Sequence, residues 1–215
     1  MDKKFLVILS VVLFALFGLF FFTSSKNEES QQSQNSSEVS VSNHSKGANS
    51  KNVELVAYSD FQCPVCAQFF PIESQVIEKY KDQIKFTFRH FPLDTIHPNA
   101  RAAHRAAEAA GKQNKFFEMH DLIYQNHSAW ETSQNAKTFF DEYAKSIGLN
   151  MEQFNNDYAS EIVNSTINAD KQEGTKRGVQ GTPTYYINGE KIENTDISSV
   201  DSFSAVIEKY INKQN

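Results

Sequence analysis

The chain opens with a long apolar run that is preceded by positive charge. The run extends from Phe5 to Phe22 and follows Lys3 and Lys4. A transmembrane helix needs roughly 18 to 20 apolar residues, so this run predicts an uncleaved signal anchor over residues 1–23. The lysines on its N-terminal side predict a cytoplasmic N-terminus, with the rest of the chain outside the cell membrane. A cleaved, secreted form is the alternative.

A polar stretch separates this run from the first patterned segment. Residues 24–51 consist mainly of Ser, Asn, Gln and Glu and contain almost nothing apolar. Such a segment cannot bury enough apolar surface to offset the entropy lost on ordering. We therefore expect a disordered linker over residues 24–51 that tethers one folded domain, residues 52–215, to the membrane.

The domain begins with signals for strand, helix and strand. Val53–Tyr58 is a short apolar run typical of a buried strand, and the segment after Cys63 carries apolar residues at helical spacing. Residues 84–91 alternate apolar and polar side chains, which predicts a half-buried strand. The order so far is β-α-β.

A block of helical patterns follows, over about residues 94–178. Pro98 and Gly111 bracket an alanine-rich helix, since proline suits a helix start and glycine a helix end. Further segments with helical spacing lie around Phe116–Ile123, Phe140–Ile147, Met151–Tyr158 and Ser160–Arg177.

The last part of the chain returns to strands. Tyr185–Ile187 and Lys191–Ile192 flank Asn188 and Gly189, a pair that favours a two-residue hairpin turn. A final amphipathic helix runs through Ile211. The predicted fold class is therefore α/β, in the order β-α-β, helical insertion, β-β-α, with a central mixed sheet flanked by helices.

Composition limits the possible partners. The 215 residues carry a net charge of −5 without a basic cluster, which argues against a nucleic-acid partner. The chain has 2 cysteines, so no further pair is available for a structural disulfide. We expect a monomer whose stability comes from its core.

The two cysteines form the motif Cys63-Pro64-Val65-Cys66, at the junction between the first strand and the first helix. Unpaired N–H groups and the positive end of the helix dipole stabilise a thiolate at such a junction. Pro64 suits the first helical position because it has no N–H to leave unsatisfied. The pattern predicts a redox-active pair with Cys63 as the nucleophile.

Two other interpretations of the motif stay open. A structural bridge across two residues closes a very small loop and therefore stabilises little. A zinc site is the second alternative, because Cys-X-X-Cys pairs also bind metal. Zinc would need two more ligands, and only His90 and His97 are candidates, by nearness in sequence alone. We therefore predict no metal site.

Four segments carry a resemblance to a known family. They are residues 59–66, His97–Ala100, Met119–Leu122 and Gly181–Thr184. A Cys-X-X-Cys after the first strand and a proline that opens the third resemble the thioredoxin fold. The domain from about Val53 to Asn212 looks like the DsbA-like thiol-disulfide oxidoreductases, which carry a helical insertion at this place.

The resemblance implies a set of site residues. Cys63 and Cys66 would be the catalytic pair, and Pro64-Val65 would tune its potential. Pro183 would be in the cis form beside the disulfide, and Thr182 would pair through its backbone with an extended substrate segment. No cofactor is implied beyond the cysteine pair itself.

One position departs from the family pattern. Thioredoxin-like enzymes commonly place a buried acid on the first strand, six residues before the first cysteine, and here that position is Ala57. The nearest acids, Glu54 and Asp60, do not fill the same place. The sequence therefore does not identify the group that takes the proton of Cys66.

The resemblance and the signal anchor together predict an extracytoplasmic oxidase that introduces disulfide bonds into exported proteins with free thiols. Its reoxidation implies a quinone-linked membrane partner of the DsbB or VKOR type. A reductase or isomerase of exported disulfides is the alternative among enzymes. A non-catalytic binding or chaperone module is the alternative outside them, although the intact Cys63, Cys66 and Pro183 argue against it.

Overall fold

The computed structural model describes residues 40–213. The predicted signal anchor, residues 1–23, lies outside the described residues, as do residues 24–39 of the predicted linker. Within the described range, none of the helices combines the length and the apolar character needed to span a bilayer.

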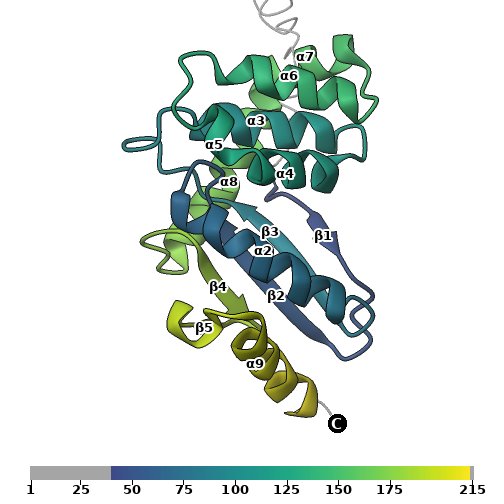
Figure 1. Cartoon of the computed structure of the whole chain (residues 1–215), viewed down its shortest axis with the longest axis vertical. Coiled ribbons are helices and arrows are strands. Elements are labelled where there is room, and N and C mark those ends of the chain that lie inside the picture. The colour runs from purple at the N-terminus through teal and green to yellow at the C-terminus, as the bar shows by residue number, and fades with distance from the viewer. Residues whose placement is uncertain (1–39, 214–215) are drawn as a thin grey trace, which may run out of the picture. The chain divides into compact units, whose positions relative to one another are not determined.

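A mixed sheet forms the centre of the domain (Figure 1). Its spatial order is β1-β3-β2-β4-β5; β2 and β3 are parallel, and the other neighbouring strands are antiparallel. The strands of the described chain are β1 (His44–Lys46), β2 (Val53–Ser59), β3 (Ile84–His90), β4 (Thr184–Ile187) and β5 (Glu190–Ile192). This arrangement confirms the predicted α/β thioredoxin-like fold with a mixed sheet.

Strand β1 corrects the predicted start of the folded domain. It lies within residues 24–51, which were predicted to be a disordered linker, and it pairs antiparallel with β3. The chain after it is also held, because Ala48 N–H donates to the Lys81 carbonyl and Lys51 N–H donates to the Gln83 carbonyl. These residues are ordered by backbone hydrogen bonds to β3 and to the turn before it, which a low apolar content does not exclude.

Helix α2 (Pro64–Lys79) connects β2 to β3, and α9 (Val200–Lys213) ends the described chain. The helical insertion lies between β3 and β4, as predicted. It contains α3 (Ala100–Gly111), α4 (Phe116–Gln125), α5 (His127–Trp130), α6 (Ala136–Ser146), α7 (Met151–Ala159) and α8 (Glu161–Lys176). Helix α5 and the 3-10 helix η1 (Asn194–Ile197) were not predicted, because four residues are too few to show a periodicity.

The alanine-rich helix α3 lies at the centre of the insertion, with α4, α6, α7 and α8 packed around it (Figure 1). Its alanines at positions 100, 103, 106, 107, 109 and 110 are all fully buried. Their small side chains allow neighbouring helices to approach α3 closely from several sides.

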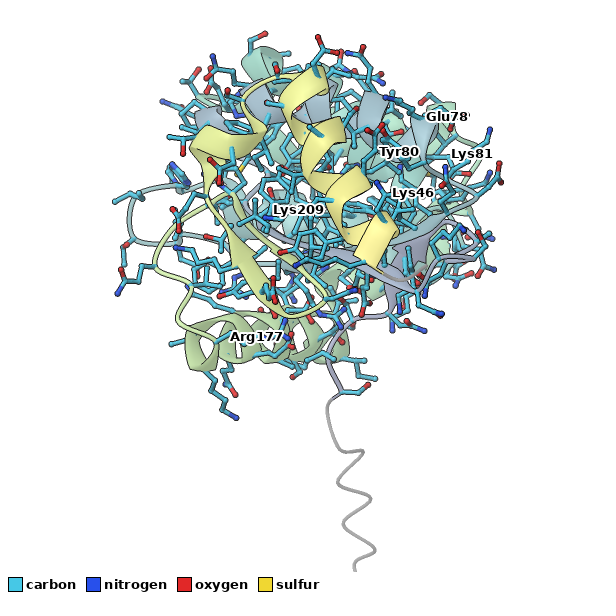
Figure 2. All side chains as sticks on the ribbon, turned by 90° about the horizontal axis from the view of Figure 1, so that it is seen from below. Lys46, Glu78, Tyr80, Lys81, Arg177 and Lys209 are labelled. Atoms are coloured by element: carbon cyan, nitrogen blue, oxygen red, sulfur yellow. The ribbon has the colours of Figure 1, made fainter. Side chains whose placement is uncertain are left out.

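One face of the sheet is covered by α2 and α9. Ala57 on β2 and Tyr185 on β4 are directly paired, so their side chains point to the same face. The Tyr185 ring packs edge-on against Phe203 of α9, at 5.6 Å between ring centroids. Figure 2 shows α9, which carries the labelled Lys209, on this side of the sheet.

The opposite face is covered by α8. Tyr58 and Tyr186, which alternate with the residues of the first face, pack edge-on against each other here. Gly174 lets α8 approach the sheet, since a Cβ atom at this position would lie 2.8 Å from the Tyr58 ring. Arg177, which follows α8 directly, lies over the Tyr186 ring at 5.1 Å and marks this side in Figure 2.

Candidate functional site

The two cysteines lie where β2 gives way to α2. Cys63 is the N-cap residue of α2, with an extended backbone (φ −65°, ψ 121°), and Pro64 stands at the helix start, as predicted. Cys66 lies in the first turn of the helix. Both cysteines are free thiols, and their side chains are almost equally hidden, with exposed fractions of 4% for Cys63 and 3% for Cys66.

The two thiols differ in their electrostatic surroundings rather than in their exposure. The hydrogen bond from the Cys66 thiol lowers the pKa of Cys63 the most. The backbone N–H groups of Cys66 and Val65, which are hydrogen-bonded to the Cys63 sulfur, lower it further. Together they lower the pKa of Cys63 to about 5, which makes it a thiolate at neutral pH. Burial raises the pKa of Cys66, and the charge of Cys63 raises it further. Cys63 is therefore the better nucleophile of the two.

The loop before β4 lies against the cysteines, although it is distant in sequence. The Thr182–Pro183 peptide bond is cis, which confirms the form implied by the family resemblance. The Cys63 thiol lies 3.4 Å from the Thr182 carbonyl oxygen. Asn194 holds the loop by donating a side-chain hydrogen bond to the Pro183 carbonyl, at 3.0 Å.

The other two residues expected at the active-site loop face solvent. Pro64 and Val65 are both exposed, and Val65 is 42% exposed although it is a large apolar residue. The site thus combines a nearly hidden sulfur, a cis-proline loop whose Thr182 carbonyl lies beside that sulfur, and an exposed apolar side chain.

Asp60 anchors the loop that precedes Cys63. Its carboxylate is fully buried and accepts hydrogen bonds from the N–H of Gln62 at 2.8 Å, the N–H of Leu93 at 2.9 Å and the ring of His97 at 2.7 Å. Burial alone would raise the pKa of Asp60, but the interactions with His104, His97 and the Leu93 N–H lower it to about 2. Asp60 is a charged structural anchor near neutral pH.

Gln62 ties the same loop to the helical insertion. Its side-chain amide donates to the Glu131 carbonyl and accepts from the Asn99 N–H, both at 2.6 Å. Its backbone carbonyl lies 2.9 Å from Nε2 of His127. The insertion therefore holds the backbone directly before Cys63.

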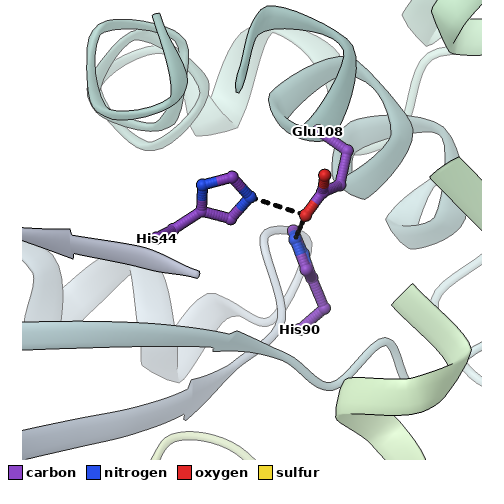
Figure 3. A group of neighbouring side chains, drawn as sticks. All are labelled: His44, His90 and Glu108. Carbon is purple, nitrogen blue, oxygen red and sulfur yellow. Dashed lines mark hydrogen bonds and ion pairs between the residues drawn. The ribbon is translucent and has the colours of Figure 1, made fainter. Parts of the chain in front are cut away.

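A second group of side chains, which contains neither cysteine, comes together as Figure 3 shows. His44 from β1, His90 from β3 and Glu108 from α3 bring three possible ligand atoms within 4.8 Å of one another. Two imidazoles and a carboxylate are a donor set that zinc uses.

The distances within this group are those of hydrogen bonds. Nε2 of His44 and Nε2 of His90 lie 2.6 Å and 2.9 Å from the same oxygen of Glu108. Ligands of a tetrahedral zinc ion at about 2.0 Å would stand roughly 3.3 Å apart. Neither Cys63 nor Cys66 belongs to the group, and His97 binds Asp60 instead, so the zinc site considered from the sequence is not assembled.

Comparisons with known proteins match this geometry. A family model described as thioredoxin covers residues 40–209. Oxidised BdbD from Bacillus subtilis superposes with a TM-score of 0.68 at 23% identity, covering 78% of this chain and 92% of that one. For alpha-DsbA1 from Wolbachia pipientis the TM-score is 0.66 at 21% identity, covering 79% and 91%.

The chain belongs to the thioredoxin family, and its fold is that of BdbD and alpha-DsbA1. The Na(+)/H(+) antiporter NhaA 3 of Salinispora tropica is 32% identical over 149 residues, which are 69% of this chain and 22% of that protein. The chain spans less than a quarter of the length of the curated relatives it matches, whose covered share is 22% to 24%.

The surroundings of Cys66 contain residues that sequence reasoning missed. Ser59 interacts with the Cys66 sulfur, and its hydroxyl lies 2.8 Å from the Tyr124 hydroxyl of α4. No local pattern identifies these two residues, because Tyr124 reaches the site from the insertion.

Glu73 and Tyr185 were also missed. Glu73 is 6% exposed, on the buried face of α2, and its carboxyl group is hydrogen-bonded to the Tyr185 hydroxyl. Here a signal was present in the sequence, since a glutamate stands between Phe70 and Val76 on the apolar stripe of the helix. An acid on the buried face of a helix that starts at an active site is a candidate functional group.

Proposed function

We propose that this DsbA-like chain is an extracytoplasmic thiol-disulfide oxidase that introduces disulfide bonds into exported proteins. The observation that carries the proposal is the stabilisation of the Cys63 thiolate by the start of α2 and by the Cys66 thiol. A stable thiolate stabilises the reduced pair, and a pair with a stable reduced form is a strong oxidant.

The proposed reaction starts from the Cys63–Cys66 disulfide. A substrate thiolate attacks the sulfur of Cys63, so that the bond between the two cysteines breaks and Cys66 leaves with its electron pair. A second substrate thiolate then attacks the substrate sulfur of the mixed disulfide, and Cys63 leaves as a thiolate. The substrate gains one disulfide, and the cysteine pair is reduced by two electrons.

The loop residues would position the substrate. The Thr182 carbonyl lies 3.4 Å from the Cys63 sulfur, so a segment paired with the backbone of Thr182 would bring its cysteine to Cys63. Pro183 shapes this loop, and the exposed side chains of Pro64 and Val65 offer an apolar surface that a substrate can cover. The reaction uses no cofactor besides the cysteine pair.

Reoxidation needs an electron acceptor in the same compartment. A quinone-linked membrane protein of the DsbB or VKOR type would take the two electrons. The signal anchor predicted over residues 1–23 would keep a monomeric domain beside this partner, with the catalytic domain outside the membrane.

The test is the equilibrium of the cysteine pair with glutathione in the full-length chain. We expect a potential of about −120 mV, where DsbA lies. A value of about −270 mV, where thioredoxin lies, would contradict an oxidase and favour a reductase. Cys63→Ser is the inactive control, and full activity in this variant would instead favour a binding module that does not use the pair.

A further inference from the structure

The proposed exchange requires a route for the proton of Cys66. Burial raises the pKa of this thiol, so the sulfur takes up a proton each time it leaves the disulfide and gives one up each time the disulfide re-forms. Asp60 cannot exchange this proton near neutral pH, since its hydrogen bonds hold its pKa at about 2. Glu54 is engaged elsewhere, in an ion pair with Lys85 at 2.8 Å.

Glu73 is a buried acid on the same side of α2 as Cys66. Seven residues separate the two, which is close to two helical turns, and helical side chains lean toward the N-terminus, so that Glu73 leans toward Cys66. The hydrogen-bond partner of its carboxyl group is Tyr185 of β4. Tyr185 is paired directly with Ala57, the position where a buried acid was expected on the strand.

Two buried tyrosines lie near both Glu73 and the Cys66 sulfur. Tyr185 and Tyr124 each lie within electrostatic range of both Cys66 and Glu73. Tyr124 is also hydrogen-bonded to Ser59, which contacts Cys66. Phe70 stacks on the Tyr124 ring at 5.1 Å between centroids, which closes this cluster on the side of α2.

We propose that Glu73 is the acid that exchanges the proton of Cys66, acting through the Tyr185 hydroxyl. The inference rests on the proposed disulfide exchange and holds for either direction of electron flow. When a substrate thiolate displaces Cys66 from the disulfide, the Cys66 thiolate takes the Tyr185 proton, and Tyr185 takes the proton of the Glu73 carboxyl. When the disulfide re-forms, both transfers run in reverse, and Glu73 exchanges its proton with water.

The charge state of Glu73 suits this role. Burial raises the pKa of Glu73 to about 7. The hydrogen bond from Tyr185 and the charge of Lys46 on β1 lower this pKa, whereas the charge of Asp121, which follows His120 on α4, raises it. A general acid and base works best when its pKa lies near the working pH. The chain thus carries a buried acid on α2, the helix over the sheet face that bears Ala57 and Tyr185.

A two-phase thiol reaction of the full-length chain tests the proposal. The reduced chain is mixed with 5,5′-dithiobis(2-nitrobenzoate), and release of the coloured thiolate is followed. The first phase reports attack by Cys63 on the reagent. The second reports attack by Cys66 on the mixed disulfide at Cys63, and this phase alone requires loss of the Cys66 proton.

In the unsubstituted chain, we expect the second-phase rate to rise with pH and to show an inflection near 7. Glu73→Gln should slow this phase by about a hundredfold, the lower end of general acid–base contributions, and remove the inflection. Its first phase should stay unchanged. The control is Glu78→Gln on the same helix, because Glu78 lies at the surface in an ion pair with Lys81 (Figure 2) and should affect neither phase.

A second phase of Glu73→Gln with the unsubstituted rate and pH profile would overturn the proposal. If Glu73→Gln does not fold, Tyr185→Phe removes the connecting hydroxyl and keeps the acid, and an unchanged second phase in this variant would also overturn it. If the second-phase rate of the unsubstituted chain showed no inflection with pH, the proposal would be overturned without any variant. If that chain showed no second phase at all, the proposed exchange itself would fail instead.

Discussion

The loop around Asp60 and the pocket around Glu73 both bury a carboxyl group close to the cysteines, but they favour opposite charge states. Asp60 accepts hydrogen bonds from Gln62, Leu93 and His97, and its pKa is lowered to about 2. Glu73 has the Tyr185 hydroxyl as its partner, and burial raises its pKa to about 7. Burial is nearly the same at both sites, so the partners decide: His104 first, then His97 and the Leu93 N–H, keep Asp60 a fixed charge, whereas Glu73 can exchange a proton.

The largest expected effect comes from removing the Asp60 carboxylate. Asp60→Ala leaves the buried donors of Leu93 and His97 without their acceptor, and breaking a buried ionic group costs about 3–5 kcal/mol. Urea unfolding of the full-length chain measures this loss. Asp82→Ala, at the exposed turn between α2 and β3, is the control, and an equal effect of both variants would contradict the anchoring role of Asp60.

The second effect is a dependence of stability on pH that belongs to Glu73. Its pKa rises from 4.5 in the unfolded chain to about 7 in the folded one, so the folded state keeps a proton that the unfolded state releases. Stability should therefore fall as the pH rises from 4.5 through 7, by about 3 kcal/mol in total.

Glu73→Gln stays neutral and lacks this loss. We therefore compare the unfolding free energies of the variant and of the unsubstituted chain. Their difference should shift by about 3 kcal/mol in favour of the variant between acid pH and pH 8. The surface variant Glu78→Gln should run parallel to the unsubstituted chain. Parallel curves for Glu73→Gln as well would mean that the pKa of Glu73 does not rise on folding.

Asp60 should give a smaller effect of opposite sign. Its pKa falls from 3.8 to about 2 on folding, so its contribution to stability is complete above pH 3.8 and is lost as the pH falls through 2. The loss amounts to about 2 kcal/mol. Acid titration of unfolding should show this loss in the unsubstituted chain, whereas Asp60→Asn should start less stable and lack it.

An effect of similar size concerns the charge on Cys63. Cys66→Ala removes the hydrogen bond that contributes most to the low pKa of Cys63. A hydrogen bond to a charged group contributes about 1.5–3 kcal/mol, so the pKa should rise by roughly one to two units. Thiolate absorbance against pH measures the shift. Val65→Ala keeps its backbone N–H and should leave the pKa of Cys63 in place.

Local chemistry was enough to predict several elements. Asn188 and Gly189 have φ values of 49° and 85°, as the two-residue hairpin requires, and β4 and β5 pair across them. The start of α2 at Pro64 and the end of α3 at Gly111 also agree with the sequence pattern. These features depend on backbone preferences of neighbouring residues, which the sequence states directly.

Contacts between distant segments could not be read in this way. Strand β1 has little apolar content, and its order comes from pairing with β3 and from bonds such as the one between Ser42 and Asp170, at 2.6 Å. The low exposure of Cys63 also comes from a distant segment, because the loop at Thr182 lies against the sulfur.

The sequence by itself determined the redox motif, the order of strands β2 to β5 and of the longer helices, and the absence of an acid at position 57. Only the tertiary structure decided which groups surround the two sulfurs. Packing α2 against β4 brings Glu73 to Tyr185, opposite Ala57, and packing the insertion against the loop brings donors to Asp60. The pKa of a buried group depends on its neighbours in space, and those neighbours are set by the packing of the whole domain.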